Sequence, residues 1–239
     1  MWLITFLLFI TMTLTNNNSN LPADNDLKAG TYEKQMVLKD GSTLRYTLHL
    51  PNLTPSKKFP LILGLHYGGE VTPYYSRGYL EKLVIPAFKS LDAIIVAPDC
   101  PGADWRDPKS EQAVLELLEK ISHQLPIDNN RTAVTGYSRG GIGTWFMATN
   151  HPKLFSAAIP ISALPKDEPN GNIPFYVIHS TKDELFKLEP TEEAVKKLES
   201  KGGKVELHVV DNITHFETER FAEPLSKAVD WLNKLWDKK

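Results

Sequence analysis

Six short apolar runs constrain the fold of this chain more than any other feature of its sequence. Each run is rich in aliphatic residues, and longer polar or amphipathic segments separate it from the next. The runs are residues 59–67, 92–98, 131–136, 156–162, 173–180 and 204–211. Nearly continuous apolar runs of this length are typical of strands that are covered on both faces of a parallel sheet. We therefore expect a central sheet with helices on both sides.

The segments between these runs show the periodicity of helices. Residues 111–125 place their apolar side chains on one face, and residues 191–202 form an amphipathic stretch that ends at two glycines. Residues 218–236 form the last helical pattern, in which Pro224 is expected to bend the helix or delay its start. Strands and helices thus alternate along most of the chain.

The N-terminal part of the domain follows a different pattern. Residues 31–50 alternate between apolar and polar side chains around Asp40-Gly41, a strong signal for an antiparallel hairpin. A hairpin followed by alternating strands and helices predicts an α/β fold with a mainly parallel, doubly wound sheet. With 239 residues, of which 41% are hydrophobic, we expect one domain over residues 30–239.

A G-x-S-x-G motif lies at the end of one apolar run. In "RTAVTGYSRGGIGT" (residues 131–144), Ser138 lies between Gly136 and Gly140, with a strand pattern before it and a helix-compatible segment after it. A tight strand-to-helix turn needs small neighbours and lifts the serine to the carboxyl edge of the sheet, where open α/β sheets bind ligands. Ser138 is therefore the predicted nucleophile. The alternative is an ordinary turn in which the serine caps a helix.

A serine nucleophile needs a base, and folds that carry this motif supply it after the serine in the chain. Four histidines follow Ser138: His151, His179, His208 and His215. His151 is expected at the end of a helix, and His179 and His208 lie within strand patterns. His215 falls in the loop between the last strand and the last helix. We predict that His215 is the base.

The acid that orients this base should lie just beyond the preceding strand. Asp183 occupies that position, three residues past the strand end, and its neighbour Glu184 is expected to be solvated. Asp211, four residues before His215, is the main alternative. An acid in this place would fix the histidine tautomer and stabilise the imidazolium that forms during attack.

When a serine attacks a carbonyl group, negative charge develops on the carbonyl oxygen and needs hydrogen-bond donors. One is expected from the backbone N–H of Arg139, directly after the nucleophile. The other is expected from "LGLHYGGE" (residues 63–70), with the N–H of Gly68 as the first choice and that of Tyr67 as the second. The alternative is a plain glycine turn at the end of a strand.

Four motifs in this order, "LHYGG", "GYSRGG", "HSTKDELF" and "THF", make the chain resemble an α/β-hydrolase of the esterase, phospholipase/carboxylesterase and dienelactone-hydrolase-like group. The resemblance covers residues 31–236. It implies ester hydrolysis through an acyl-enzyme on the serine, without a cofactor. Tyr67 departs from the His-Gly-Gly-Gly type of loop by replacing its first glycine, which leaves the second oxyanion donor open.

The sequence says less about the substrate and the residues that bind it. The link "ALPKDEPNGN" (residues 163–172) is too short for a cap, so we expect an open site that suits a bulky or carbohydrate-linked acyl or feruloyl ester. Tyr74, Tyr75 and Trp105 are candidate substrate-binding residues, with ordinary packing as the alternative. Two other functions stay open at this point: a serine peptidase of the prolyl-oligopeptidase type, and a non-catalytic binding protein on the same fold.

Composition excludes several other classes of function. The net charge of −2 gives no reason to expect a nucleic acid partner, and the single cysteine, Cys100, cannot form an intrachain disulfide. No H-E-x-x-H or similar metal motif occurs. The apolar run "MWLITFLLFITMTLT" predicts that residues 1–20 are a signal peptide or an N-terminal anchor, so we expect export without a stable membrane span in the mature protein.

Overall fold

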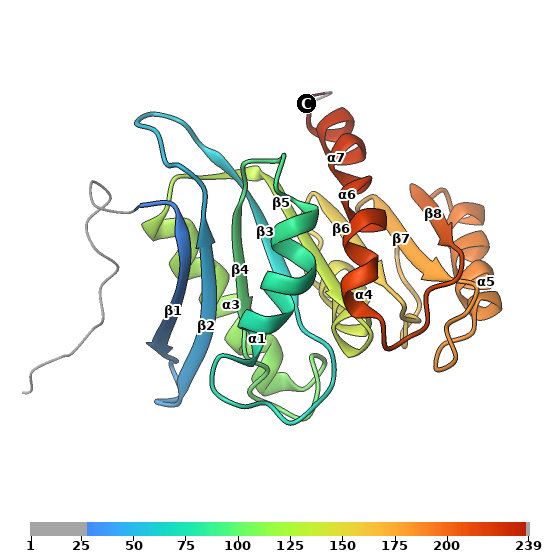
Figure 1. Cartoon of the computed structure of the whole chain (residues 1–239), viewed down its shortest axis with the longest axis horizontal. Coiled ribbons are helices and arrows are strands. Elements are labelled where there is room, and N and C mark those ends of the chain that lie inside the picture. The colour runs from blue at the N-terminus through green and yellow to red at the C-terminus, as the bar shows by residue number, and fades with distance from the viewer. Residues whose placement is uncertain (1–27, 238–239) are drawn as a thin grey trace, which may run out of the picture.

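The computed structural model describes residues 28–237 and contains one eight-stranded sheet (Figure 1). The strands are β1 (Gly30–Val37), β2 (Thr43–Leu50), β3 (Phe59–Leu65), β4 (Ile94–Pro98), β5 (Ile127–Tyr137), β6 (Ala157–Ile161), β7 (Phe175–Ser180) and β8 (Val205–Val210). Their order across the sheet is β1-β2-β4-β3-β5-β6-β7-β8. β2 pairs antiparallel with β1 and β4, and every other pair is parallel. The predicted doubly wound sheet with an antiparallel start is confirmed.

The hairpin turns where its sequence predicts. Leu38 N–H donates to Ser42 O at 2.8 Å, and Gly41 has a φ of +83°. That left-handed conformation costs glycine little and other residues more. The turn fixes the register of β1 against β2, and β2 then joins the parallel strands through β4.

Helices cover both faces of the sheet. One face holds α3 (Pro108–Gln124), α4 (Arg139–Asn150) and α5 (Leu188–Ser200), and the other holds α1 (Tyr75–Tyr79), the π-helical turn η2 (Leu80–Val84), α2 (Ile85–Ala87), α6 (Ala222–Ser226) and α7 (Ala228–Trp236). Adjacent residues of one strand enter different cores: Leu61 and Leu63 pack beneath α3, whereas Ile62 packs beneath α1. This is why the strand sequences read as continuous apolar runs.

One helical segment is not among the helices predicted from the sequence. Residues 75–87 carry α1, η2 and α2 in succession, although Gly78 and Pro86 are poor helix formers. Their stability comes from packing, because Tyr79, Leu83 and their apolar neighbours are fully buried against the sheet. Local propensity is too weak to predict a helix of this kind.

The last helical pattern is divided into pieces. A 3₁₀ turn, η3 (Thr218–Phe221), precedes α6, which contains Pro224, and α7 follows after Lys227. The start of the long helix is therefore delayed, as the proline predicts. Between β6 and β7 the link holds no helix, so no cap covers the sheet edge there.

The predicted signal peptide or anchor, residues 1–20, lies outside the described residues. Within residues 28–237, every helix is too short or too polar to cross a membrane.

Candidate active site

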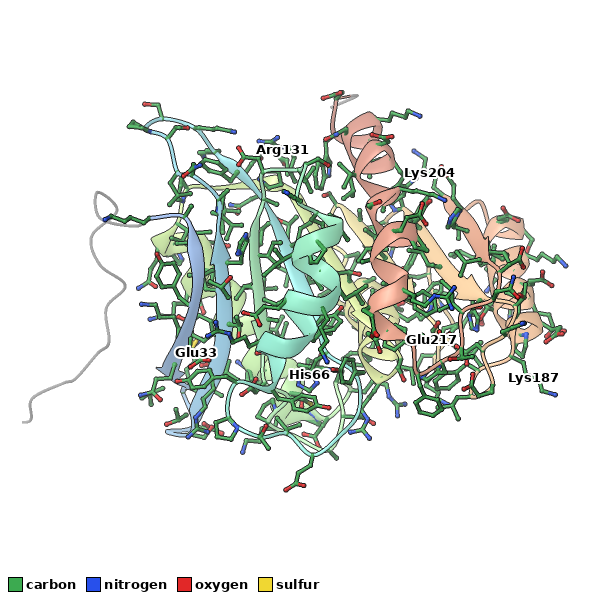
Figure 2. All side chains as sticks on the ribbon, viewed as in Figure 1. Glu33, His66, Arg131, Lys187, Lys204 and Glu217 are labelled. Atoms are coloured by element: carbon green, nitrogen blue, oxygen red, sulfur yellow. The ribbon has the colours of Figure 1, made fainter. Side chains whose placement is uncertain are left out.

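The carboxyl ends of the parallel strands meet on one side of the molecule. Figure 2 shows His66 and Glu217, which follow β3 and β8, toward the lower side of the view. Arg131, in the first half of β5, and Lys204, just before β8, lie toward the upper side. The lower side is therefore the carboxyl edge, where ligands bind in open α/β sheets.

Ser138 occupies the turn between β5 and α4 at this edge. Its φ of 55° and ψ of −118° are strained for a residue with a side chain. Two hydrogen bonds hold the turn, from Ser138 N–H to Ile161 O at 3.0 Å and from Ile142 N–H to Ser138 O at 3.0 Å. A Cβ on Gly140 would lie 1.8 Å from Leu65 O, so only glycine lets α4 approach β3 this closely. The motif glycines thus permit the elbow that exposes the serine.

His215 lies in the loop between β8 and η3, with its ring directed at Ser138. Its Nε2 is 2.8 Å from Ser138 Oγ, and its Nδ1 is 2.8 Å and 2.9 Å from the two carboxylate oxygens of Asp183. An ionised carboxylate can only accept, so Nδ1 carries the proton and donates to Asp183. Nε2 is then free to accept the hydroxyl proton of Ser138. Asp183, His215 and Ser138 therefore form one continuous hydrogen-bonded chain.

Asp183 is held in its charged form. Its carboxylate is buried, and its Oδ1 accepts backbone N–H bonds from Leu185 at 3.0 Å and from Phe186 at 2.7 Å. Burial acts to raise the pKa of Asp183, but the hydrogen bonds from His215 and Phe186 outweigh it and lower that pKa below its ordinary value. The carboxylate is consequently negative at neutral pH and suited to orient the ring of His215.

Two side chains hold the backbone of His215: Glu184, which follows Asp183, and Tyr137, which precedes Ser138. Glu184 Oε2 accepts the N–H of His215 at 2.8 Å, and the hydroxyl of Tyr137 donates to the carbonyl oxygen of His215. Glu184 was expected to be solvated, and it is exposed, but it also anchors this loop. Sequence reasoning missed both contacts. Their only signal is position, since Tyr137 precedes Ser138 and Glu184 follows Asp183.

The alternative candidates bond to other groups, although His179 Nε2 also lies 3.8 Å from Asp183 Oδ2. Asp211 is exposed and accepts from Thr181 Oγ1 at 3.0 Å. His179 is buried, with Nδ1 2.8 Å from Thr191 Oγ1 and Nε2 2.6 Å from Phe186 O. His151 ends α4, as expected, and His208 lies within β8. Of the acids and bases weighed from the sequence, the geometry joins only Asp183 and His215 to Ser138.

The loop after β3 lies against the elbow, so the expected oxyanion donors are close together. Tyr67 and Gly68 line the same cavity as Ser138, and within residues 28–237 no protein acceptor takes the N–H of Tyr67, Gly68 or Arg139. His66 pins this loop, because its Nδ1 donates to Tyr67 O at 2.7 Å while its Nε2 accepts Cys100 N–H at 3.0 Å. Burial lowers the pKa of His66, which keeps that ring neutral.

Two of the three candidate aromatic residues, Trp105 and Tyr75, pack against this loop. Trp105 is buried and donates through its indole N–H to His66 O at 2.9 Å. The Tyr75 ring packs edge-on against His66 and Tyr67, with ring centroids 4.9 Å and 5.8 Å away. Tyr74 donates its backbone N–H to Asp99 Oδ2 at 2.6 Å. Trp105 also lines a cavity beside Ser138, whereas Tyr74 and Tyr75 do not.

The cleft at Ser138 has two lobes that share Gly68, Ser138 and Leu185. The histidine lobe, of about 450 Å³, is lined chiefly by Tyr67, Lys82, Tyr137, His215, Phe216 and Glu219. The arginine lobe, of about 280 Å³, is lined by Asp104, Trp105, Arg106, Arg139, Ile142 and Phe186. Ser138 lies where the lobes meet, so an ester carbonyl at the serine would extend one group into each. Within residues 28–237 no histidine, cysteine and carboxylate side chains cluster to hold a metal ion.

Comparisons with known proteins relate this chain to esterases. Residues 104–184 match the family model described as "Putative esterase". The chain is 27% identical over 210 residues to feruloyl esterase D of Neurospora crassa, covering 78% of this chain and 70% of that protein. A solved thermostable esterase superposes with a TM-score of 0.72 at 26% identity, over 85% of this chain and 62% of that one.

A second solved structure supports the fold alone. A ferulic acid esterase superposes with a TM-score of 0.71 at 21% identity, over 87% of this chain and 99% of that one. The superposition extends over nearly the whole length of that esterase, so the two chains share their overall fold.

Proposed function

We propose that this carboxylic ester hydrolase, whose chain has the α/β-hydrolase fold, cleaves its substrate through a Ser138-His215-Asp183 triad and an acyl-enzyme intermediate. The observation that carries the proposal is the hydrogen-bonded chain from Asp183 through His215 to Ser138 Oγ, with each bond 2.8–2.9 Å long. The strained elbow presents that oxygen to the cleft, and the buried carboxylate holds the imidazole in the tautomer that a general base needs.

The proposed acylation begins when Ser138 Oγ attacks the ester carbonyl carbon and its proton passes to His215 Nε2. The tetrahedral intermediate then collapses by breaking the bond to the alcohol oxygen, which leaves with the proton from His215. Asp183 stabilises the imidazolium while it exists. The acyl group remains on Ser138 as an ester.

Deacylation repeats these steps with water. His215 Nε2 takes a proton from a water molecule as its oxygen attacks the acyl carbon, and the bond to Ser138 Oγ breaks. Ser138 recovers its proton from His215, and the carboxylic acid departs. No cofactor is required, because each proton is returned within one cycle.

The negative charge on the carbonyl oxygen is proposed to bind the N–H of Arg139 together with that of Gly68, or of Tyr67. Among the described residues these N–H groups have no protein acceptor, and they lie on the first turn of α4 and on the loop after β3 that His66 holds. Loss of one such donor typically lowers kcat by about 10²–10³.

A carbohydrate-linked acyl ester, with a feruloyl ester as one member of that class, is the substrate that we propose. The uncapped edge between β6 and β7 leaves room for a bulky alcohol, and the two lobes accept groups on both sides of the serine. The likeness to feruloyl esterase D supports the feruloyl ester within that class.

Two expectations about the whole chain join this proposal. We propose that residues 30–239 form one domain, since a single sheet runs from β1 to β8. Residues 1–20 are proposed to direct export as a signal peptide, because their uncharged apolar run is shorter than the about 20 residues that a span needs.

Partitioning of the acyl group tests the mechanism. Two esters with the same acyl group and different alcohols are hydrolysed in the same concentration of methanol, and the ratio of methyl ester to free acid is measured. A common acyl-enzyme requires one ratio for both esters. A ratio that changes with the leaving alcohol would show that water attacks the substrate directly.

A further inference from the structure

The geometry points to Arg139 as a specificity determinant: we propose that the arginine lobe binds the acyl half of the ester and that the Arg139 guanidinium selects acyl groups carrying a carboxylate. This inference rests on the proposed function, since it assigns the two halves of the substrate around Ser138. It concerns the side chain of Arg139, which is separate from the backbone N–H proposed for the oxyanion.

The position of His215 decides which half of the ester enters which lobe. The departing alcohol oxygen takes its proton from His215 Nε2, so that oxygen must come within hydrogen-bond reach of the ring. His215 lines the histidine lobe and does not line the arginine lobe. The alcohol therefore extends into the histidine lobe, and the acyl chain, on the other side of the carbonyl, extends into the arginine lobe.

The arginine lobe carries one positive charge that is not paired with any carboxylate in the described part of the chain. Arg106 is paired with Asp104, at 3.1 Å between Nη2 and Oδ2. Arg139 forms no ion pair with any carboxylate of residues 28–237, and its one hydrogen bond, to Ala103 O, is 3.5 Å long. The lobe's two arginines and one aspartate thus leave a net charge of +1. A guanidinium without a partner suits a carboxylate, which it can bind through two parallel hydrogen bonds.

The guanidinium also lies close to the reacting carbonyl. A Cβ on Gly68 would meet the Cζ, Nε and Nη2 atoms of Arg139 at 3.0 Å, so the guanidinium packs on the residue proposed to donate to the oxyanion. Trp105, Ile142 and Phe186 contribute apolar wall to the same lobe. Such a lobe admits an apolar acyl group, and the guanidinium is placed to favour one that carries a carboxylate a few bonds from the ester.

The histidine lobe provides an internal contrast. Its charged side chains are Lys82 and Glu219, whose opposite charges cancel, so the alcohol half meets no comparable net charge. Selection for charge is therefore expected on the acyl side of the ester and not on the alcohol side.

Two methyl esters of nearly equal shape test the proposal: methyl hydrogen succinate, which carries a carboxylate, and methyl succinamate, which carries a neutral carboxamide. The ratio of their kcat/KM values is measured from methanol release. The wild type is expected to favour the carboxylate by about tenfold, because a charge-assisted pair at an exposed guanidinium is partly screened. Arg139→Gln is expected to bring the ratio close to one, and Arg139→Lys to restore part of it.

Lys82→Gln is the matched control, because it removes a cation from the other lobe. Its ratio is expected to stay at the wild-type value, and added salt should lower the ratio in the wild type but not in Arg139→Gln. A wild-type ratio no higher than that of Arg139→Gln would overturn the inference. An equal loss of the carboxylate preference in Lys82→Gln would also overturn it, since the preference would then come from the electrostatic field of the whole protein.

A second readout separates this inference from the proposed function. The rate at which Ser138 reacts with a carboxylate-bearing fluorophosphonate is compared with the rate for its carboxamide analogue, in the wild type and in Arg139→Gln. If Ser138 is labelled but the ratio of the two rates is the same in Arg139→Gln as in the wild type, the role of Arg139 is contradicted and the triad is not. Absence of any label on Ser138 contradicts the triad and, with it, the inference that depends on it.

Discussion

The carboxylate of Glu184 accepts a hydrogen bond from the backbone N–H of His215, 2.8 Å away. On the other side of the same residue, the Tyr137 hydroxyl donates to the His215 carbonyl. The residue after the proposed acid and the residue before the proposed nucleophile therefore hold the backbone of the proposed base. A displacement of that loop would move Nε2 away from Ser138 Oγ.

Glu184→Ala is expected to lower kcat by about tenfold with little change in KM, because the loop that positions His215 loses an anchor while the substrate lobes keep their shape. Glu184→Gln should retain most activity, since its amide oxygen can still accept from the N–H. Steady-state kinetics of both variants provide the measurement. Equal losses in the two would indicate that the charge of Glu184 matters rather than its hydrogen bond.

The choice of acid can be tested by a pair of substitutions. Asp183→Asn should lower kcat by about 10²–10⁴, because an amide cannot hold the histidine in the required tautomer as a carboxylate does. Asp211→Asn should stay within about twofold of the wild type, since Asp211 is exposed and bonded to Thr181. A larger loss from Asp211→Asn than from Asp183→Asn would overturn the assignment of the acid.

The lowered pKa of Asp183 predicts a dependence of stability on pH. A carboxyl group whose folded pKa is depressed stabilises the fold above its unfolded value, about 3.9, and that contribution is lost as the pH falls through the folded pKa. The free energy of unfolding should therefore fall less for Asp183→Asn than for the wild type between pH 5 and pH 3. Urea titrations at both pH values measure it, and a parallel fall in the two proteins would contradict it.

Substitution by alanine at two glycines should change the free energy of unfolding in opposite directions. Gly140→Ala would place a Cβ 1.8 Å from Leu65 O, so we expect it to lower the free energy of unfolding by more than about 2 kcal/mol. Gly78→Ala meets no atom within 4 Å in helix α1 and is expected to raise it by about 0.5–1 kcal/mol. Denaturant unfolding measures both. If Gly140→Ala were as stable as the wild type, the close approach of α4 to β3 would be wrong.

The strands could be predicted from the sequence because burial on both faces leaves a continuous apolar pattern, as in β3 and β5. The helices over residues 75–87 could not, because they depend on packing of Tyr79 and Leu83 that overrides Gly78 and Pro86. Chain order and loop position were enough to select Ser138, Asp183 and His215 as candidates, whose catalytic roles stay predictions.

The supporting contacts of the site could not be found in the same way. Glu184, Tyr137 and His66 bond to backbone groups of other loops, and a backbone acceptor or donor leaves no trace in the sequence of its partner. Trp105 illustrates the same limit, because position alone did not distinguish an exposed stacking surface from a buried indole bonded to His66 O.

Labelling with a fluorophosphonate, followed by peptide mapping, tests the central claim most directly. We predict one adduct per folded chain, on Ser138, with labelling abolished in Ser138→Ala and strongly slowed in His215→Ala. An adduct on another residue, or a folded wild-type protein that resists labelling while it hydrolyses esters, would contradict the assignment of Ser138 as the nucleophile.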